Sequence, residues 1–143
     1  MKAGRVYLDA SILVALLTED SLSARADAFL YAQRPILVVS DFAAAEFSSA
    51  IARLVRMQRI TADEARVAFS TFDVWVSRTT EWVTTAAADV KAAQAYLRRL
   101  DLTLRTPEAL NIAIAQRAGA ALATFDEKMA GGARALGTEV VSA

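Results

Sequence analysis

The stretch Arg5-Val6-Tyr7-Leu8-Asp9 is a short apolar run that ends on a carboxylate. A continuous apolar run is typical of a strand in a parallel sheet, because helices cover both faces of such a sheet. The other runs that predict strands are Ile36 to Val39, Glu81 to Thr84, Ala120 to Phe125 and Thr138 to Val141. Helical segments separate these runs, and the alternation predicts a single α/β domain over residues 1–143 with a mostly parallel sheet.

The middle of the chain predicts a helical hairpin from Phe42 to Ser77. Ser40 and Asp41 are suited to cap a helix that runs to about Arg59. The run Thr61-Ala62-Asp63-Glu64 matches a capping box and opens the second helix of the hairpin. Apolar side chains at spacings of three and four form a stripe along this second helix, which we expect to lie mostly in the core. The stripe consists of Ala65, Ala68, Phe69, Phe72, Trp75 and Val76.

Further helices are predicted over Ser11 to Leu17 and Thr85 to Leu100, and over Asp20 to Gln33. In the last of these, the apolar side is expected to carry Ala24, Ala28 and Tyr31. A later helix is expected to begin with Thr106 as its N-cap and Pro107 as its first residue, and to close at Gly119. A short helix from Asp126 is predicted to run into Gly131-Gly132.

The chain contains no Cys and no His, and this excludes several kinds of chemistry. A disulfide, a thiolate nucleophile, a zinc site built on His or Cys and a Ser-His-Asp triad are all ruled out. Acid–base catalysis would fall to carboxylates, Lys, Tyr or water bound to a metal. No apolar run reaches the ~18–20 residues that span a bilayer, and no secretory signal is recognisable, so a cytoplasmic location without a membrane partner is expected.

The net charge is zero, but 13 of the 16 basic residues are arginine. Arginine suits bidentate contacts with phosphate, although biased genomic base composition explains the excess equally well. Two groups of arginines are candidate contacts for the phosphates of a nucleic acid, and ordinary solvated helix faces are the alternative for both. The first group is Arg53, Arg56 and Arg59 on the long helix, and the second is Arg98, Arg99 and Arg105.

Four carboxylates are candidates for one site. Asp9 and Asp126 follow predicted strands, and ligands of open α/β sheets bind beyond the carboxyl ends of strands. The alternative is that each simply caps the next helix. Glu46 lies in an uncharged stretch of helix with no cation three or four residues away. Glu108 lies in the first turn of its helix, where the helix dipole alone favours an acid.

Gathered in one pocket, such acids would have to be protonated or hold a cation. Oxygen ligands with open positions suit Mg²⁺ or Mn²⁺. Without His, metal-bound water is the expected nucleophile and phosphodiester cleavage the expected reaction. Coordinates that place Asp9, Glu46 and Asp126 on separate sides of the molecule would end this hypothesis.

Several of these motifs together resemble those of PIN-domain nucleases, and the nearest pattern is that of VapC-type toxins. The four motifs are Tyr7 to Leu13, Glu46 within Ser40 to Ser49, Leu104 to Ala113, and Ala123 to Asp126. The resemblance covers essentially the whole chain and implies a three-layer fold, with a parallel sheet flanked by helices. It also implies that Asp9, Glu46, Glu108 and Asp126 are the catalytic and metal-binding acids, and that Ser11 and Thr124 line their site.

The resemblance further implies an endoribonuclease toxin that uses Mg²⁺ or Mn²⁺, forms a homodimer and is neutralised by a cognate antitoxin. Two positions depart from the family pattern: Glu108 stands where Asp is common, and Asn111 stands where His is frequent. The longer Glu108 side chain leaves open a catalytically weak PIN-like module that binds RNA or a partner. An unrelated Mg²⁺-dependent phosphohydrolase is the third hypothesis.

Overall fold

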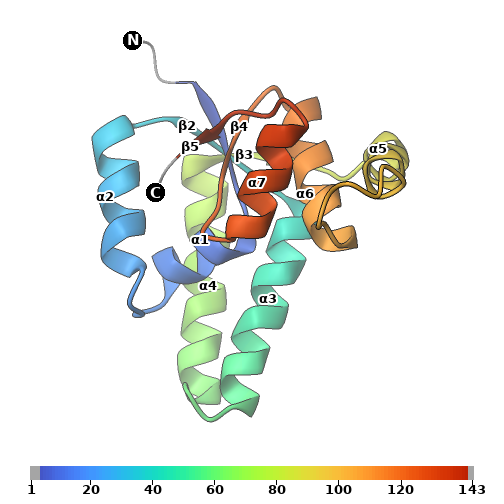
Figure 1. Ribbon diagram of the computed structural model, residues 1–143. Helices are drawn as coiled ribbons and strands as arrows, with labels where there is room; N and C mark the ends of the chain where they lie inside the picture. Colours follow the sequence, from blue (N-terminus) through green and yellow to red (C-terminus); the bar gives the residue numbers. More distant parts are fainter. Residues whose placement is uncertain (1–3, 142–143) are drawn as a thin grey trace.

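The computed structural model describes residues 4–141 and contains one five-stranded sheet in which every neighbouring pair of strands is parallel (Figure 1). The strands are β1 (Arg5–Leu8), β2 (Ile36–Ser40), β3 (Thr80–Val83), β4 (Ala121–Ala123) and β5 (Val140–Val141). Their order across the sheet is β3-β2-β1-β4-β5, so β1 lies at the centre. The predicted α/β fold is confirmed, and its sheet is parallel throughout the described residues.

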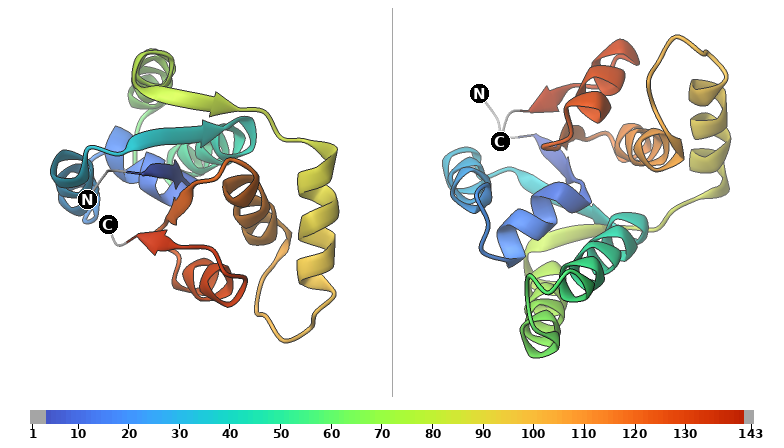
Figure 2. Two further views of the ribbon diagram at one scale, coloured as in Figure 1. Left: turned by 90° about the horizontal axis from the view of Figure 1, so that it is seen from above. Right: turned by 60° about the horizontal axis from the view of Figure 1, so that its bottom comes forward.

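Helices cover both faces of this sheet and make a three-layer arrangement (Figures 1 and 2). The helices are α1 (Ala10–Leu17), α2 (Ser23–Gln33), α3 (Asp41–Arg56), α4 (Ala62–Thr79), α5 (Ala87–Leu97), α6 (Thr106–Arg117) and α7 (Glu127–Ala135). Helices α1 to α4 contact one another, and α6 contacts both α5 and α7. Within the described part of the chain, no helix is long and apolar enough to cross a membrane.

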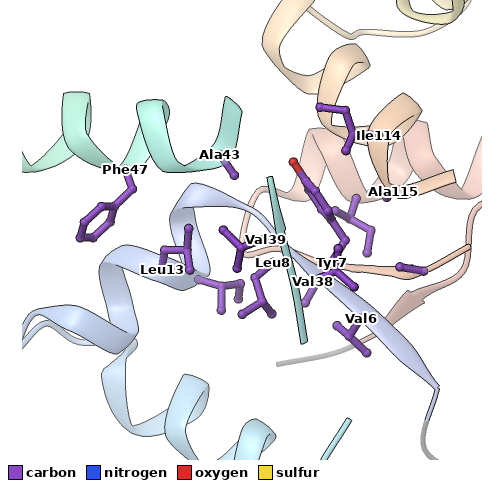
Figure 3. Close-up of a cluster of buried hydrophobic side chains, with 14 of the residues drawn as sticks. Val6, Tyr7, Leu8, Leu13, Val38, Val39, Ala43, Phe47, Ile114 and Ala115 are labelled. Atoms are coloured by element: carbon purple, nitrogen blue, oxygen red, sulfur yellow. The ribbon is translucent and has the colours of Figure 1, made fainter. Parts of the chain in front are cut away.

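Strand β1 is buried on both faces, which explains its unbroken apolar run. Its side chains alternate between two layers of the core: Tyr7 lies beside Ile114 and Ala115, whereas Leu8 lies toward Leu13 (Figure 3). Tyr7 and Leu8 are both 0% exposed. Core side chains therefore pack against both faces of the central strand and fix the position of its carboxyl end.

The predicted hairpin is confirmed as α3 and α4. The ring of Phe47 on α3 stacks on Phe72 of α4 with centroids 4.5 Å apart and meets Phe69 edge-on. Thr61 and Glu64 form the predicted capping box at the start of α4. The first helix ends at Arg56, not Arg59, because the chain turns through the left-handed conformation of Gln58. Arg59 therefore lies in the turn and does not continue the helical row of arginines.

The prediction for the buried side of α2 is wrong. The side of α2 with Ala24, Ala28 and Tyr31 is exposed, and Ala26 and Phe29 are buried instead. Helix α2 is rich in alanine on both sides, so the large Phe29 decides which side faces the core.

Helix α6 begins one residue earlier than predicted. Arg105 takes the extended N-cap conformation and Thr106 is the first helical residue. Pro107 lies in the first turn, where its missing N–H leaves no hydrogen bond unmade. The predicted end is confirmed, because Gly119 takes a φ of +65° immediately after the helix.

Helix α7 runs through Gly131 and Gly132 and ends only at Ala135. The two glycines differ in their surroundings. A Cβ at Gly132 would lie 2.6 Å from Cδ2 of Leu104, whereas nothing lies within 4 Å of a Cβ at Gly131. Gly132 therefore lets the chain segment before α6 pack closely against α7.

This difference predicts opposite effects for two neighbouring substitutions. Gly132→Ala should lower the free energy of unfolding by about 1–3 kcal/mol, because Leu104 must be displaced. Gly131→Ala, on the exposed side of the same helix, should raise it by roughly 0.5–1 kcal/mol because alanine restricts the unfolded chain. Urea unfolding of both variants measures the effects, and equal shifts of the same sign would contradict the packing argument.

Candidate active site

Asp9 and Asp126 follow two adjacent strands of the sheet. Strands β1 and β4 pair in parallel with Leu8 opposite Ala123, and the Asp9 N–H donates to the Ala123 carbonyl over 3.3 Å. The carboxyl ends of both strands therefore reach the same edge of the sheet. Asp9 is 3% exposed there, and Asp126 is half-buried.

Two hydroxyl groups tie these two strand ends together. Ser11 Oγ donates to Asp9 Oδ1 over 2.6 Å and accepts from the Phe125 N–H at 3.0 Å. Thr124 Oγ1 donates to Asp9 Oδ2 and accepts from the Asp126 N–H at 2.9 Å. The carboxylate of Asp9 is thus held on both oxygens. Ser11 and Thr124, which the family resemblance predicts to line the site, both contact Asp9 directly.

Both aspartates also cap helices, as the alternative interpretation of the sequence stated. Asp9 accepts from the Ile12 N–H at the start of α1, and Asp126 accepts from the Met129 N–H at the start of α7. The two interpretations are compatible. A capping carboxylate is fixed in place, and the positive end of the helix dipole stabilises its negative charge.

Glu46 and Glu108 reach the same region from helices α3 and α6. Asn111 Nδ2 donates to Glu46 Oε1 over 2.7 Å, which joins the two helices. Glu108 is 4% exposed, and Arg105 Nε lies 3.2 Å from its Oε1. The guanidinium-bearing side chain of Arg105 is 82% exposed. The sequence did not reveal the partner of Glu46, because the amide of Asn111 comes from another helix.

Burial and mutual repulsion raise the pKa of two of these acids. Burial raises the pKa of the Asp9 carboxyl; hydrogen bonds from Ser11 and Thr124 oppose this rise, and the charge of Asp126 adds to it. Burial likewise raises the pKa of Glu46, and the charges of Asp9 and Glu108 add to the rise. All four acids therefore share one electrostatic environment.

The donor chemistry of this pocket fits a divalent cation. Between residues 4 and 141, no group of three or more acidic side chains is arranged closely enough to hold one metal ion. Mg²⁺, however, is commonly bound through one or two carboxylates and keeps several waters. A pair of carboxylates such as Asp9 and Asp126 meets that requirement with oxygen ligands alone. A hollow of about 180 Å³ lies beside Asp126 and is lined in part by Arg25, Phe125 and Arg134.

The arginines proposed to contact RNA differ in their exposure and in their partners. Arg53, Arg56 and Arg98 are exposed, and Arg99 is paired with Asp101 at 2.8 Å. At 1.5 Å per residue, Arg56 lies about 15 Å along α3 from Glu46. Of the six arginines, Arg105 is the one that contacts an acid of the pocket.

A buried polar chain that the sequence analysis did not predict lies behind the acids. Tyr7 Oη contacts Ser40 Oγ and donates to Asn111 Oδ1. Burial raises the pKa of Tyr7 above its ordinary value, so the hydroxyl stays protonated at neutral pH. A tyrosine inside an apolar strand carries no pattern that distinguishes it from a core residue.

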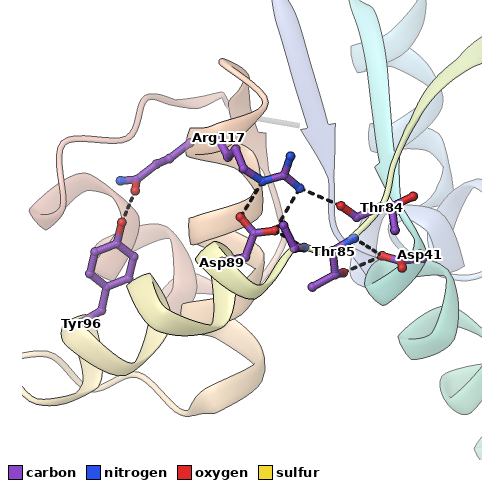
Figure 4. A network of polar contacts seen from close by, with 8 residues as sticks. Asp41, Thr84, Thr85, Asp89, Tyr96 and Arg117 are labelled. Carbon is purple, nitrogen blue, oxygen red and sulfur yellow. Dashed lines mark hydrogen bonds and ion pairs between the residues drawn. The ribbon is translucent and has the colours of Figure 1, made fainter.

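A second polar network lies at the other end of α6 (Figure 4). Arg117 donates to both oxygens of Asp89 and to the Thr84 carbonyl, and Thr85 donates to Asp41. These contacts fix the link between β3 and α5 against α3 and α6. The network therefore holds the two helices that carry Glu46 and Glu108.

The fold and its acidic edge define a class of α/β protein with carboxylates at the carboxyl ends of β1 and β4. The family model of the PIN domain matches residues 6–134. The chain belongs to the PIN-domain family. Among curated protein sequences, none matches this chain significantly.

Solved structures with similar folds include toxins and toxin–antitoxin complexes. VapC20 of Mycobacterium tuberculosis, described as a toxin that cleaves the sarcin-ricin loop, is 20% identical with a TM-score of 0.73, covering 95% of this chain and 98% of that chain. VapBC2 from Rickettsia felis, bound to promoter DNA, is 16% identical with a TM-score of 0.70, covering 97% and 98%. A toxin–antitoxin complex from Klebsiella pneumoniae is 22% identical with a TM-score of 0.60, covering 89% and 91%.

The raised pKa of Asp9 predicts a pH-dependent gain in stability on removing its charge. The folded protein binds this proton more tightly than the unfolded chain, so the free energy of unfolding falls as pH rises from 3.8 through the folded-state pKa. In EDTA at pH 7, Asp9→Asn should therefore require more urea to unfold than the wild type. The gain should vanish below the ordinary pKa of 3.8.

The control is Asp73→Asn, which removes an exposed aspartate on α4. This variant should unfold with the wild type at every pH. A stability difference between Asp9→Asn and the wild type that stays constant from pH 7 to below 3.8 would contradict the assigned burial of the charge.

Proposed function

We propose that this protein is an endoribonuclease that depends on Mg²⁺ or Mn²⁺, and the toxin of a toxin–antitoxin pair. The observation that carries the proposal is the placement of Asp9, buried and held on both oxygens, beside Asp126 and within the electrostatic reach of Glu46. All of residues 1–143 would form the one catalytic domain. The cytoplasm, where RNA is accessible, is the proposed location.

The acids have distinct roles in this proposal. Asp9 and Asp126 hold the divalent cation, and Glu46 binds the cation or its waters. When bound, that cation supplies the positive charge that activates water and neutralises the scissile phosphodiester. Glu108 contributes negative charge to the same pocket, and Ser11 and Thr124 keep the Asp9 carboxylate oriented.

The substrate must approach this negative pocket with its own negative backbone. Arg105 presents an exposed guanidinium at the rim, and Arg25 and Arg134 line the hollow beside Asp126. These cations offset the repulsion between phosphate and carboxylates. RNA is the proposed substrate because one similar structure, VapC20, is described as a toxin that cleaves the sarcin-ricin loop.

A cognate antitoxin is the proposed protein partner, and the toxin would form a homodimer within the complex. This proposal draws on similar structures that were solved as toxin–antitoxin complexes. A segment of the antitoxin would cover the acidic pocket and compete with RNA.

A second candidate function is RNA or partner binding without efficient cleavage. Its support is the pairing of Glu108 with Arg105, which occupies one oxygen of an acid expected to face the cation. Such a module need not hold a metal ion at all.

The decisive experiment is RNA cleavage by toxin that is free of antitoxin. We expect cleavage in Mg²⁺, none in EDTA, and a loss of at least ~100-fold in Asp9→Asn and Asp126→Asn, since metal stabilisation of the transition state contributes several kcal/mol. Asp73→Asn serves as the control because it removes an exposed acid away from the pocket. Cleavage that survives both EDTA and Asp9→Asn would place the reaction elsewhere.

Two companion measurements separate the alternatives. A folded wild type that binds Mn²⁺ weakly or not at all and leaves RNA intact would indicate the binding module. Hydrolysis of small phosphate esters without RNA cleavage would indicate a phosphohydrolase.

Contact between Arg105 and RNA predicts a specific change in salt dependence. Arg105→Ala should reduce the slope of log affinity against log salt by ~0.7, the value for one phosphate contact with a single strand. Arg66→Ala is the matched control, because Arg66 is exposed on α4 and paired with Asp63. Binding of a catalytically inactive Asp9→Asn background to RNA at several salt concentrations gives both slopes, and equal slopes would exclude the contact.

A further inference from the structure

A chain of buried polar groups leads from the centre of the sheet to the acidic pocket. Ser40 Oγ, at the end of β2, lies 2.7 Å from Tyr7 Oη of β1. Tyr7 Oη donates to Asn111 Oδ1 of α6 over 2.5 Å. Asn111 Nδ2 donates in turn to Glu46 Oε1 of α3. Tyr7, Ser40 and Asn111 are all 0% exposed, so water does not compete for the two hydrogen bonds among them.

The direction of each hydrogen bond in this chain is determined. Asn111 Oδ1 can only accept, so it uses the single proton of Tyr7, and the Tyr7 oxygen then accepts from Ser40. The two amide hydrogens of Asn111 go to Glu46 and to the Pro107 carbonyl. A flipped amide would set its oxygen against two acceptors. The three hydrogen bonds of the chain therefore run in one direction, from Ser40 through Tyr7 and Asn111 to Glu46.

Glu46 needs such a partner because it is repelled by its neighbours. It is half-buried, and the charges of Asp9 and Glu108 both act on it. Repulsion favours conformations in which its carboxylate swings out to water. The bond from Asn111 holds Oε1 inward and leaves the second oxygen of Glu46 for a cation or its waters.

We propose that Tyr7 is a positioning residue for the nuclease reaction, which acts through Asn111 to fix the carboxylate of Glu46 in the acidic pocket. The inference rests on the proposed function. A phenylalanine at position 7 would fill the same space in the core. The hydroxyl is therefore not needed to fill the core around β1, and its role is to hydrogen-bond Asn111 and Ser40.

The molecule contains a matched control for this relay of hydrogen bonds from Tyr7 through Asn111 to Glu46. The control involves the same helix, α6. Tyr96 Oη donates to Gln116 Oε1 of α6, and the Gln116 amide nitrogen donates to Thr138 and to the Leu136 carbonyl. Tyr96→Phe thus removes one phenol hydroxyl from a tyrosine–amide pair, as Tyr7→Phe does. The difference is that the Gln116 amide ends on neutral groups instead of an acid of the pocket.

The test is the dissociation constant for Mn²⁺, measured by electron paramagnetic resonance on antitoxin-free protein without RNA. Loss of an outer hydrogen bond to a metal ligand typically weakens metal binding by about 10–100-fold, and we expect about 10-fold for Tyr7→Phe. Tyr96→Phe should bind Mn²⁺ like the wild type. In RNA cleavage at limiting Mg²⁺, Tyr7→Phe should lower kcat and leave the KM for RNA unchanged.

Equal Mn²⁺ dissociation constants for Tyr7→Phe and Tyr96→Phe would overturn the relay. Should Tyr7→Phe fail to fold, Asn111→Ala decides the question in the same titration, since it removes the donor to Glu46 directly. A wild type that binds Mn²⁺ without cutting RNA would refute the proposed function alone. The role of Tyr7 would still be tested, because the Mn²⁺ titration does not require RNA cleavage. A wild type that binds no Mn²⁺ would overturn both.

Discussion

Repulsion between carboxylates that the fold withdraws from water is the constraint on which the rest of this structure depends. Four acids from four separate parts of the chain share one electrostatic environment, and burial raises the pKa of two of them. The fold opposes this repulsion at each position. Parallel pairing of β1 with β4 sets the two strand ends side by side, and hydroxyl groups and helix N-termini then supply donors to the negative charges. The free-energy cost of this repulsion is offset by the apolar core, which buries the central strand on both faces.

The two interpretations of Asp9 and Asp126, as helix caps or as functional acids, turn out to describe the same geometry. In a parallel sheet each strand leads into a helix, so the residue that caps the helix also stands at the carboxyl edge where ligands bind. A cap restricts the rotamer of the carboxylate, and restriction is what a metal ligand needs. Capping therefore prepares these side chains for a site and is no argument against one.

Local signals in the sequence were sufficient for most of the fold. The apolar runs, the Thr61–Glu64 capping box and the left-handed Gly119 each act within a few residues, and the structure confirms all three. Predictions failed where the local structure depends on a contact with a residue that is distant in the sequence. The buried side of α2 depends on where Phe29 meets the core, and the close approach of Gly132 to Leu104 joins α7 to the segment before α6. The pairing of Glu46 with Asn111 spans 65 positions, so no local spacing could reveal it.

The departures at Glu108 and Asn111 are linked through the structure. Both lie on one face of α6, one turn apart; Glu108 meets Arg105, and Asn111 meets Glu46. Pairing with Arg105 reduces the net negative charge that Glu108 adds to the pocket, and the neutral amide of Asn111 adds none. Because an asparagine amide does not titrate near neutral pH, Asn111 remains a neutral donor to Glu46 there, whereas a histidine would change its charge. In this chain, α6 therefore balances charge around Glu46, and the burden of binding a cation falls on Asp9 and Asp126 under the proposed function.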